Sequence, residues 1–332
     1  MANLYLTEQG SVLRKKGERL IVEKDEEVLL DVECHKIDAV LIFGNVQFTT
    51  QAVHELFQHG IELAILTRTG RLIGQITSPT TKNIELRVEQ FKKYEDGVFK
   101  LRFSRSIVTG KIRNSLQMLR LFSYNHPEID LKEETQGLER AENGISQQNT
   151  IESLNGVEGM AARYYFNGFG KMILGDFVFD GRKKYPAPDP VNALLSLGYT
   201  MVFNEISSLL DGMGFDPYLG YFHKIDYGRA SLASDLMEEF RAPVSDRLTL
   251  RLINNRILIE KDFYDNPKGG IYLTRDGMKK YFSEFEDFIN HEFTHPETKE
   301  KTSLRKCFRI QIEKLASYIR GEREYQPFYL EI

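Results

Sequence analysis

The 332-residue sequence lacks the hallmarks of several common protein classes, and each absence narrows what the chain can be. It has no run of about 18 apolar residues, and its first 16 residues alternate polar and apolar side chains, unlike a signal peptide. Its two cysteines, Cys34 and Cys307, lie far apart without a CxxC pattern, which argues against a zinc ribbon and a disulfide framework. We therefore expect a cytoplasmic protein with no membrane segment and with reduced, core-packed thiols.

Several catalytic motifs are also missing. GxxxxGK[ST], GxGxxG, HExxH and GxSxG do not occur, so a P-loop, a Rossmann cofactor site, a zincin and an α/β-hydrolase lack support. The net charge of -4 excludes a uniformly basic nucleic-acid coat. The hydrophobic content of 41% is ordinary for globular cores, and the length allows two domains.

Charge is nevertheless segregated along the chain. Residues 87–120 hold nine Lys or Arg against three acids, whereas residues 121–158 hold eight acids against two bases. Such a chain can present a basic face to a polyanion while its average stays acidic. Two solvated helix faces of opposite sign explain the counts equally well.

The periodicity predicts an α+β fold with a small N-terminal β domain followed by a larger, all-α C-terminal domain. Short aliphatic and β-branched runs such as RLIVE, EVLLDV, AVLIFG and ELAILT predict strands before residue 80, interrupted by a helix capped at Thr49 or Thr50. After the turn-rich SPTTKN the period changes from two to about 3.6. Asp189 followed by Pro190 predicts the start of a buried helix. We assign a β domain to residues 1–80, a linker to 81–88 and a helical domain to 89–332.

The chemistry is concentrated between Phe215 and Pro243, where His223 precedes a helix-like segment carrying Asp235, Glu238 and Glu239. At spacings of three and four, these acids share neighbouring parts of one helical face and repel one another by a few tenths of a kcal/mol per pair. A divalent ion, a nearby arginine such as Arg241 or solvent would relieve that repulsion.

A further acid, Glu158, lies between two glycines at a helix start, where a capping role is the simpler explanation. If Glu158, His223 and Glu238 converge, one imidazole and two carboxylates would suit Mn²⁺ or Mg²⁺. Such a site can activate a water or hydroxyl for phosphodiester chemistry, with Asp235 orienting His223. Spacing alone does not show convergence, and a helix with acids in its first turns beside an unrelated histidine explains the same residues.

Four separated segments together resemble one family, the CRISPR-associated integrase of spacer acquisition, the first-numbered universal protein of CRISPR adaptation. They are AVLIFGNVQFTTQAVHELFQHGIELAILTRTGRLIGQI, NGVEGMAARYYF, DPVNALLSLGY and GFDPYLGYFHKIDYGRASLASDLMEEFRAPV. The tail ending GEREYQPF also fits, so the resemblance covers nearly the whole chain.

This resemblance implies a metal-dependent DNA endonuclease and integrase of antiviral defence that holds Mg²⁺ or Mn²⁺ through Glu158, His223 and Glu238. Many members carry Asp at the last position, which leaves Glu239 as the alternative ligand. Asp235 matches another family acid that supports catalysis.

The resemblance also implies partners. Tyr165 and Asn192 match motif positions near the site and are expected, with Arg241, to contact DNA. The family form is a homodimer paired through the β domains, with two dimers bridged by the second CRISPR-associated protein of adaptation. A noncatalytic DNA-binding scaffold of the same assembly is the alternative function, and a hydrolase of small phosphoesters is a third.

Overall fold

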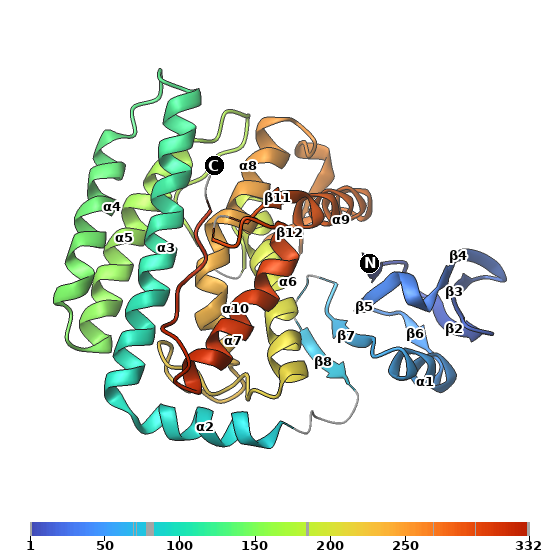
Figure 1. Cartoon of the computed structure of the whole chain (residues 1–332). Coiled ribbons are helices and arrows are strands. Elements are labelled where there is room, and N and C mark those ends of the chain that lie inside the picture. The colour runs from blue at the N-terminus through green and yellow to red at the C-terminus, as the bar shows by residue number, and fades with distance from the viewer. Residues whose placement is uncertain are drawn as a thin grey trace. The chain divides into compact units, whose positions relative to one another are not determined.

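Residues before position 80 form mainly strands and residues after position 83 form mainly helices, as the change in hydrophobic period predicts. The computed structural model describes residues 2–68, 70, 72–77, 83–183, 186–267, 269–295 and 297–330. The chain divides into two units, Met1–Thr80 and Thr81–Ile332 (Figure 1). A β-rich first unit and a mostly helical second unit confirm the predicted α+β class.

The N-terminal unit contains two four-stranded sheets. In the first, ordered β1-β5-β7-β8, the strands β1, β5 and β7 are parallel and β8 is antiparallel to β7. In the second, ordered β4-β3-β2-β6, only the β2–β6 pair is parallel. The elements are β1 (Ala2–Leu6), β2 (Val12–Lys16), β3 (Arg19–Lys24), β4 (Glu27–Glu33), η1 (Cys34–Lys36), β5 (Ile37–Phe43), β6 (Gln47–Phe48), α1 (Thr50–Gln58), β7 (Glu62–Leu66) and β8 (Leu72–Ile76).

Most of this unit follows from the sequence pattern. The predicted helix is α1, whose first amides are capped by Thr49, and Gly60 after it has a φ of 67°. Two strands were not predicted. β2 buries only Leu13 and carries three basic residues, and β6 has two residues, so neither shows an alternating hydrophobic pattern.

The C-terminal unit is built from helices of very different length. α3, α4 and α5 lie side by side, and the tail before residue 331 runs along α3, where Asn114 binds Phe328 and Leu330 (Figure 1). The elements are α2 (Ile84–Glu95), α3 (Gly97–Asn125), α4 (Lys132–Gly144), η2 (Ile145–Gln147), α5 (Ile151–Lys171), α6 (Pro190–Met213), α7 (Ser231–Met237), η3 (Glu238–Phe240), η4 (Arg241–Asp246), α8 (Arg247–Asn254), η5 (Glu260–Asp262), β9 (Phe263–Asp265), β10 (Ile271–Leu273), α9 (Arg275–Asn290), β11 (Glu292–Thr294), β12 (Lys301–Ser303) and α10 (Leu304–Ile319).

The core helix α6 begins and ends as its sequence predicts. Asp189 caps it by accepting from the amide of Asn192 at 2.7 Å, Pro190 occupies the first turn, and Gly214 ends it with a φ of 96°. Within the described residues, α6 alone has the length and apolar content of a membrane span. Of its apolar window 61% is buried inside the structure, as in a core helix.

Two expectations about the helical unit need correction. It is not all α, because β9 pairs with β10 and β11 with β12 as short antiparallel hairpins. Strands of three residues are too short to produce a hydrophobic period. The linker is also shorter than residues 81–88, because α2 begins at Ile84. Residues 78–82, where the turn-rich segment lies, fall outside the described residues.

Candidate active site

A cavity of about 480 Å³ in the helical unit contains all three predicted metal ligands. Glu158 comes from the first half of α5, His223 from the loop before α7, and Glu238 from η3 directly after α7. The structure therefore brings together three segments that are separate in the sequence.

Lys111 of α3 occupies the space between the two carboxylates. Its ammonium nitrogen contacts Glu158 Oε1 and lies 2.7 Å from Glu238 Oε2. Burial opposes the charge on Lys111, but the two carboxylates outweigh it and raise the lysine pKa. The position between Glu158 and Glu238 is thus one where the protein stabilises a cation.

Glu238 is almost fully buried and remains ionised. Arg241 Nε donates to Glu238 Oε2 at 2.9 Å, the same oxygen that Lys111 contacts. Burial would raise the pKa of Glu238, but the charges of Arg241, Lys111 and His223 lower it to about 2. Glu238 can therefore serve as an anionic ligand over the whole physiological pH range.

Asp235 holds His223 in one orientation. Its fully buried carboxylate accepts from the backbone amides of Tyr221, Phe222 and His223 at 2.7–3.0 Å, and His223 Nδ1 lies 2.7 Å from Asp235 Oδ1. Because an ionised carboxylate only accepts hydrogen bonds, Nδ1 carries the proton. In the neutral ring the lone pair is then on Nε2, which lies 3.8 Å from Glu238 Oε1 and is the atom that can bind a metal.

Close packing of the loop against α7 requires glycine at position 220. A Cβ atom there would lie 2.6 Å from the carbonyl carbon of Ser231 and 2.8 Å from Asp235 Oδ2. The loop amides could not then reach the Asp235 carboxylate. Gly220 thus allows the contact that positions His223.

The helix that carries the acids changes its hydrogen-bond period after Met237. α7 is followed by a 3₁₀ turn, η3, and then by a π-helical turn, η4, which contains Pro243. A proline lacks an amide hydrogen, and π turns inside helices often occur at functional sites. Successive residues of a helix point about 100° apart, so Glu239 faces away from the side that Asp235 and Glu238 share. The expectation that all three acids share one helical face was therefore wrong.

Glu239 points away from the cavity and anchors the C-terminal tail. It accepts hydrogen bonds from the Phe328 amide at 2.7 Å, from Gln311 Nε2 at 2.9 Å and from the Tyr325 hydroxyl at 2.5 Å. Burial raises its pKa to about 7, although these donors favour the ionised form. With its oxygens engaged inside the protein, Glu239 does not compete with Glu238 as a ligand.

A second buried network forms the wall of the cavity behind Arg241. Asp246 accepts from the hydroxyls of Tyr165 at 2.8 Å and Tyr199 at 2.6 Å. The Arg241 guanidinium lies over the Tyr199 ring, 4.3 Å from its centroid. Tyr165 and Arg241, both predicted to contact DNA, therefore make contacts inside the protein. Tyr165 binds Asp246, and Arg241 packs on Tyr199 and binds Glu238.

Asn192 is fully buried, and its side chain binds only protein. Its oxygen accepts from the Lys183 amide and from Arg182 Nη1, each at 2.9 Å, and its nitrogen donates to Asp189 and to the Gly181 carbonyl. This corrects the expectation of a DNA contact, because burial leaves none of its polar atoms for a nucleic acid. Its contacts instead hold Gly181 and Arg182 at the cavity.

The basic side chains best placed to meet an anion line the opening. Arg163 and Arg229 border the cavity and are exposed, and Arg182 is partly exposed. By contrast, several bases of the segment 87–120 pair with acids of the segment that follows: Lys111 with Glu158, Arg113 with Glu142 and Arg120 with Glu139. For these residues the opposite charges of the two segments form ion pairs between helices that pack together.

The donor set fits a hard divalent cation. Two carboxylates and one imidazole suit Mn²⁺ or Mg²⁺, with water completing the coordination. The donors of Glu158, His223 and Glu238 do not all lie within 4.8 Å of one another while Lys111 stands between the carboxylates. Metal binding would require Lys111 to withdraw and the carboxylates to close on the ion.

Lys111 and Asp246 are two of the site residues that sequence reasoning missed. Lys111 was counted only as one of nine bases in a helical stretch, and Asp246 lies in no recognisable motif. Both act through contacts with residues 47 or more positions away, such as Lys111 with Glu158 and Asp246 with Tyr199. No spacing rule connects such pairs.

Replacing Asp246 with asparagine is expected to change how stability depends on pH. Burial raises the pKa of Asp246 from 3.8 to about 6, against the hydrogen bonds from Tyr199 and Tyr165. A carboxyl whose pKa is raised by folding takes up a proton on folding, so its contribution to the free energy of unfolding falls as the pH rises through this interval. Relative to wild type, the variant should gain about 2 kcal/mol between pH 4 and pH 7, at about 1.4 kcal/mol per tenfold change in proton affinity and with the unfolded carboxyl already about half ionised at pH 4. Urea denaturation at both pH values measures this, and a pH-independent difference would contradict it.

The chain matches known proteins along nearly its whole length. The family model described as "CRISPR associated protein Cas1" matches residues 4–287. Curated relatives include CRISPR-associated endonuclease Cas1 3 of Thermus thermophilus, which is 36% identical over 98% of this chain and 96% of the relative. CRISPR-associated endonuclease Cas1 1 of Chlorobaculum tepidum is 33% identical over 98% of this chain and 97% of the relative.

Solved structures agree on the fold. A Cas1 protein from Thermotoga maritima superposes with a TM-score of 0.81 at 23% identity, covering 100% of both chains. A chain of a Cas6-RT-Cas1–Cas2 complex superposes with a TM-score of 0.83 at 26% identity, covering 99% of this chain and 36% of that longer chain. The family match, and relatives more than 30% identical over 98% of the sequence, show that this chain belongs to the Cas1 family of CRISPR-associated proteins.

Proposed function

We propose that this chain is a metal-dependent DNA integrase and endonuclease that inserts short DNA fragments into a CRISPR array. The observation that carries the proposal is the convergence of Glu158, Glu238 and the Nε2 atom of His223 on one cavity. The curated relatives are named as Cas1 endonucleases, which supports the same assignment.

Glu158, His223 and Glu238 would hold Mg²⁺ or Mn²⁺. When bound, such an ion polarises a phosphoryl oxygen and lowers the pKa of a coordinated hydroxyl or water. Asp235 keeps His223 Nε2 directed into the cavity, and Arg241 keeps Glu238 in place. Lys111, once displaced from between the carboxylates, would remain near the scissile phosphate as a positive charge.

The proposed reaction is a transesterification. The 3′-oxygen of the fragment forms a bond to a phosphorus of the repeat, and the bond from that phosphorus to the target's own 3′-oxygen breaks. The attacking hydroxyl loses its proton and the departing oxygen gains one from solvent. One phosphodiester bond forms for each one that breaks, so the reaction consumes no high-energy phosphate. Arg163, Arg182 and Arg229 at the opening would bind the phosphates on either side. Water in place of the fragment's hydroxyl gives endonuclease cleavage.

The chain is expected to act in an assembly. We propose a homodimer paired through the β units, bridged to a second dimer by the second CRISPR-associated adaptation protein. The edge strand β4 exposes Val28, Leu29 and Leu30, which supports pairing through this unit. One solved relative is a complex named for both Cas1 and Cas2, which supports the proposed partner.

A strand-transfer assay with chemically defined fragment ends tests this function. The chain and its adaptation partner would be incubated with a labelled short duplex and a repeat-containing plasmid. With Mg²⁺ or Mn²⁺ we expect covalent joining of fragments that end in a 3′-hydroxyl. We expect none with a 3′-deoxy end, because the nucleophile is then missing, and none in EDTA.

Other outcomes identify the competing functions. DNA binding without joining under every metal condition would favour a noncatalytic scaffold. Turnover of a chromogenic phosphodiester without DNA would favour a small-molecule phosphoesterase. Joining that is unaffected by EDTA would contradict the proposed metal site.

A further inference from the structure

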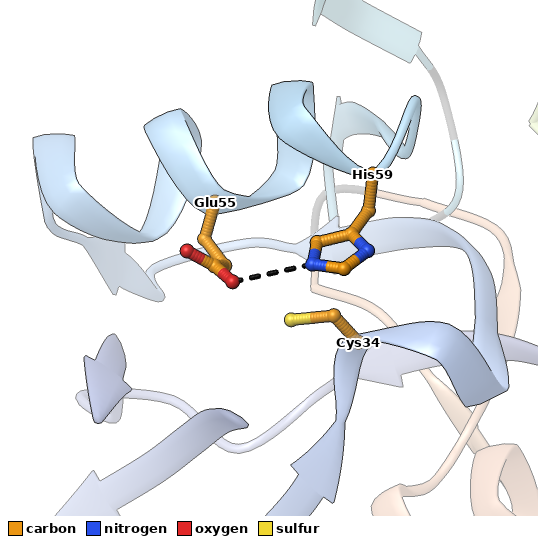
Figure 2. Close-up of side chains that lie close together, drawn as sticks. All are labelled: Cys34, Glu55 and His59. Atoms are coloured by element: carbon orange, nitrogen blue, oxygen red, sulfur yellow. Dashed lines mark hydrogen bonds and ion pairs between the residues drawn. The ribbon is translucent and has the colours of Figure 1, made fainter. Parts of the chain in front are cut away.

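The N-terminal β unit contains a second cluster of metal-binding side chains, unrelated to the cavity in the helical unit. Cys34 lies in η1, between β4 and β5, while Glu55 and His59 lie at the end of α1. One ligand atom from each of the three falls within 4.8 Å of the others. Figure 2 shows Glu55 and His59 descending from one helix toward the Cys34 side chain below it.

The spacing of the donors on α1 suits a shared ion. Glu55 and His59 are four residues apart and so share a helix face, and His59 Nε2 lies 3.3 Å from Glu55 Oε1. Ligands about 2.0–2.3 Å from a tetrahedral ion stand at about this separation. The two side chains thus already have the geometry of neighbouring ligands, and Cys34 faces them from another segment.

The environment of Glu55 supports an ionised ligand. This carboxylate is 2% exposed, and its Oε2 is paired with the ammonium of Lys15 on β2. That pairing leaves Oε1, the oxygen beside His59, directed at the cluster. Lys15 would then orient the carboxylate from behind without blocking the metal.

We propose that Cys34, Glu55 and His59 form a zinc site that ties the η1 turn to α1. A thiolate, an imidazole and a carboxylate make a mixed set that Zn²⁺ accepts, whereas Mg²⁺ and Mn²⁺ prefer oxygen donors. The two anionic ligands balance the charge of the ion. The His59 ring is about one-third exposed, so water can complete the tetrahedron from the solvent side.

Zinc would also change the state of the thiol. Zn²⁺ binds the Cys34 side chain as a thiolate, so binding releases the thiol proton. This site differs from the proposed catalytic site in ligand chemistry, which allows the two to be measured separately.

Cobalt substitution of the full-length protein tests the proposal, because a thiolate bound to Co²⁺ produces a charge-transfer absorption band that oxygen and nitrogen ligands do not. We expect the band in the wild-type protein, its loss in Cys34→Ser, and a band in His59→Gln that needs about tenfold more Co²⁺ to develop. Matched controls are Cys307→Ser, which removes the other thiol, and His54→Gln, which changes an exposed histidine on the same helix. Both controls should keep the band.

Zinc affinity provides a second measurement through competition with a chromogenic chelator. We expect one tightly bound zinc per chain, and binding weaker by about tenfold or more in His59→Gln. If Cys34→Ser fails to fold, His59→Gln still decides the question, because its ring is partly exposed. Absence of the band in wild type, a band that survives Cys34→Ser, or a metal affinity that is unchanged in His59→Gln would overturn the proposal.

Discussion

Replacing Glu238 with glutamine is expected to reduce strand transfer by about a thousandfold. The substitution removes one of two anionic ligands while keeping the shape of the side chain. A bound metal contributes several kcal/mol of transition-state stabilisation, and each 1.4 kcal/mol corresponds to about a tenfold change in rate. Glu158→Gln should have an effect of similar size, because its oxygen lies on the other side of the same cation position.

A matched control separates loss of the metal from general damage. Glu152 lies on the same helix as Glu158 but is exposed in the first turn, so Glu152→Gln should retain wild-type activity. Binding of Mn²⁺, measured by electron paramagnetic resonance, should weaken in Glu158→Gln and Glu238→Gln and remain unchanged in Glu152→Gln. Full strand transfer by Glu238→Gln would show that the metal is held elsewhere.

Replacing Glu239 with alanine is expected to destabilise the fold by about 3–5 kcal/mol. The truncation leaves the buried Phe328 amide and Tyr325 hydroxyl without their acceptor and removes one partner of Gln311. The tail residues 325–330 would lose their attachment next to Asn114 of α3, which itself binds Phe328 and Leu330. Guanidinium denaturation measures the loss, with the exposed Glu322→Ala as the control.

Substitutions of the two neighbouring glutamates are expected to have different effects. Glu238 substitutions should reduce activity and metal binding, whereas Glu239→Ala should reduce stability. A Glu239→Ala protein with wild-type stability and no Mn²⁺ binding would reverse the assignment of the two residues.

Much of the fold could be predicted because it depends on neighbouring residues. Thr49 and Asp189 cap helices through amides three residues away, and Gly214 ends α6 through its own backbone conformation. Short elements were not predicted, because they bury too few side chains to produce a hydrophobic period. The strands of the two hairpins in the helical unit have three residues each, and β2 buries a single side chain.

The sequence singled out residues that lie together in the structure, and their roles stay predictions. Glu158, His223, Asp235 and Glu238 were chosen from the sequence, and the structure places them around one cavity or directly behind it. The prediction of residues that contact DNA agrees less well with the structure. Asn192 matched a motif position, yet its burial against Gly181 and Lys183 cannot be read from its neighbours along the chain.

The sequence by itself determined the change from a β-rich to a helical unit, the family and the segments that carry the acids, because these depend on local propensity and on motif identity. Only the tertiary structure decided where each acid lies. Glu238 and Glu239 are adjacent in the chain, so their side chains diverge, and packing places Glu238 at the cavity and Glu239 against the C-terminal tail. In the same way, packing alone brought Lys111 between the two carboxylates and Cys34 beside His59, since side chains distant in sequence meet only once the core has formed.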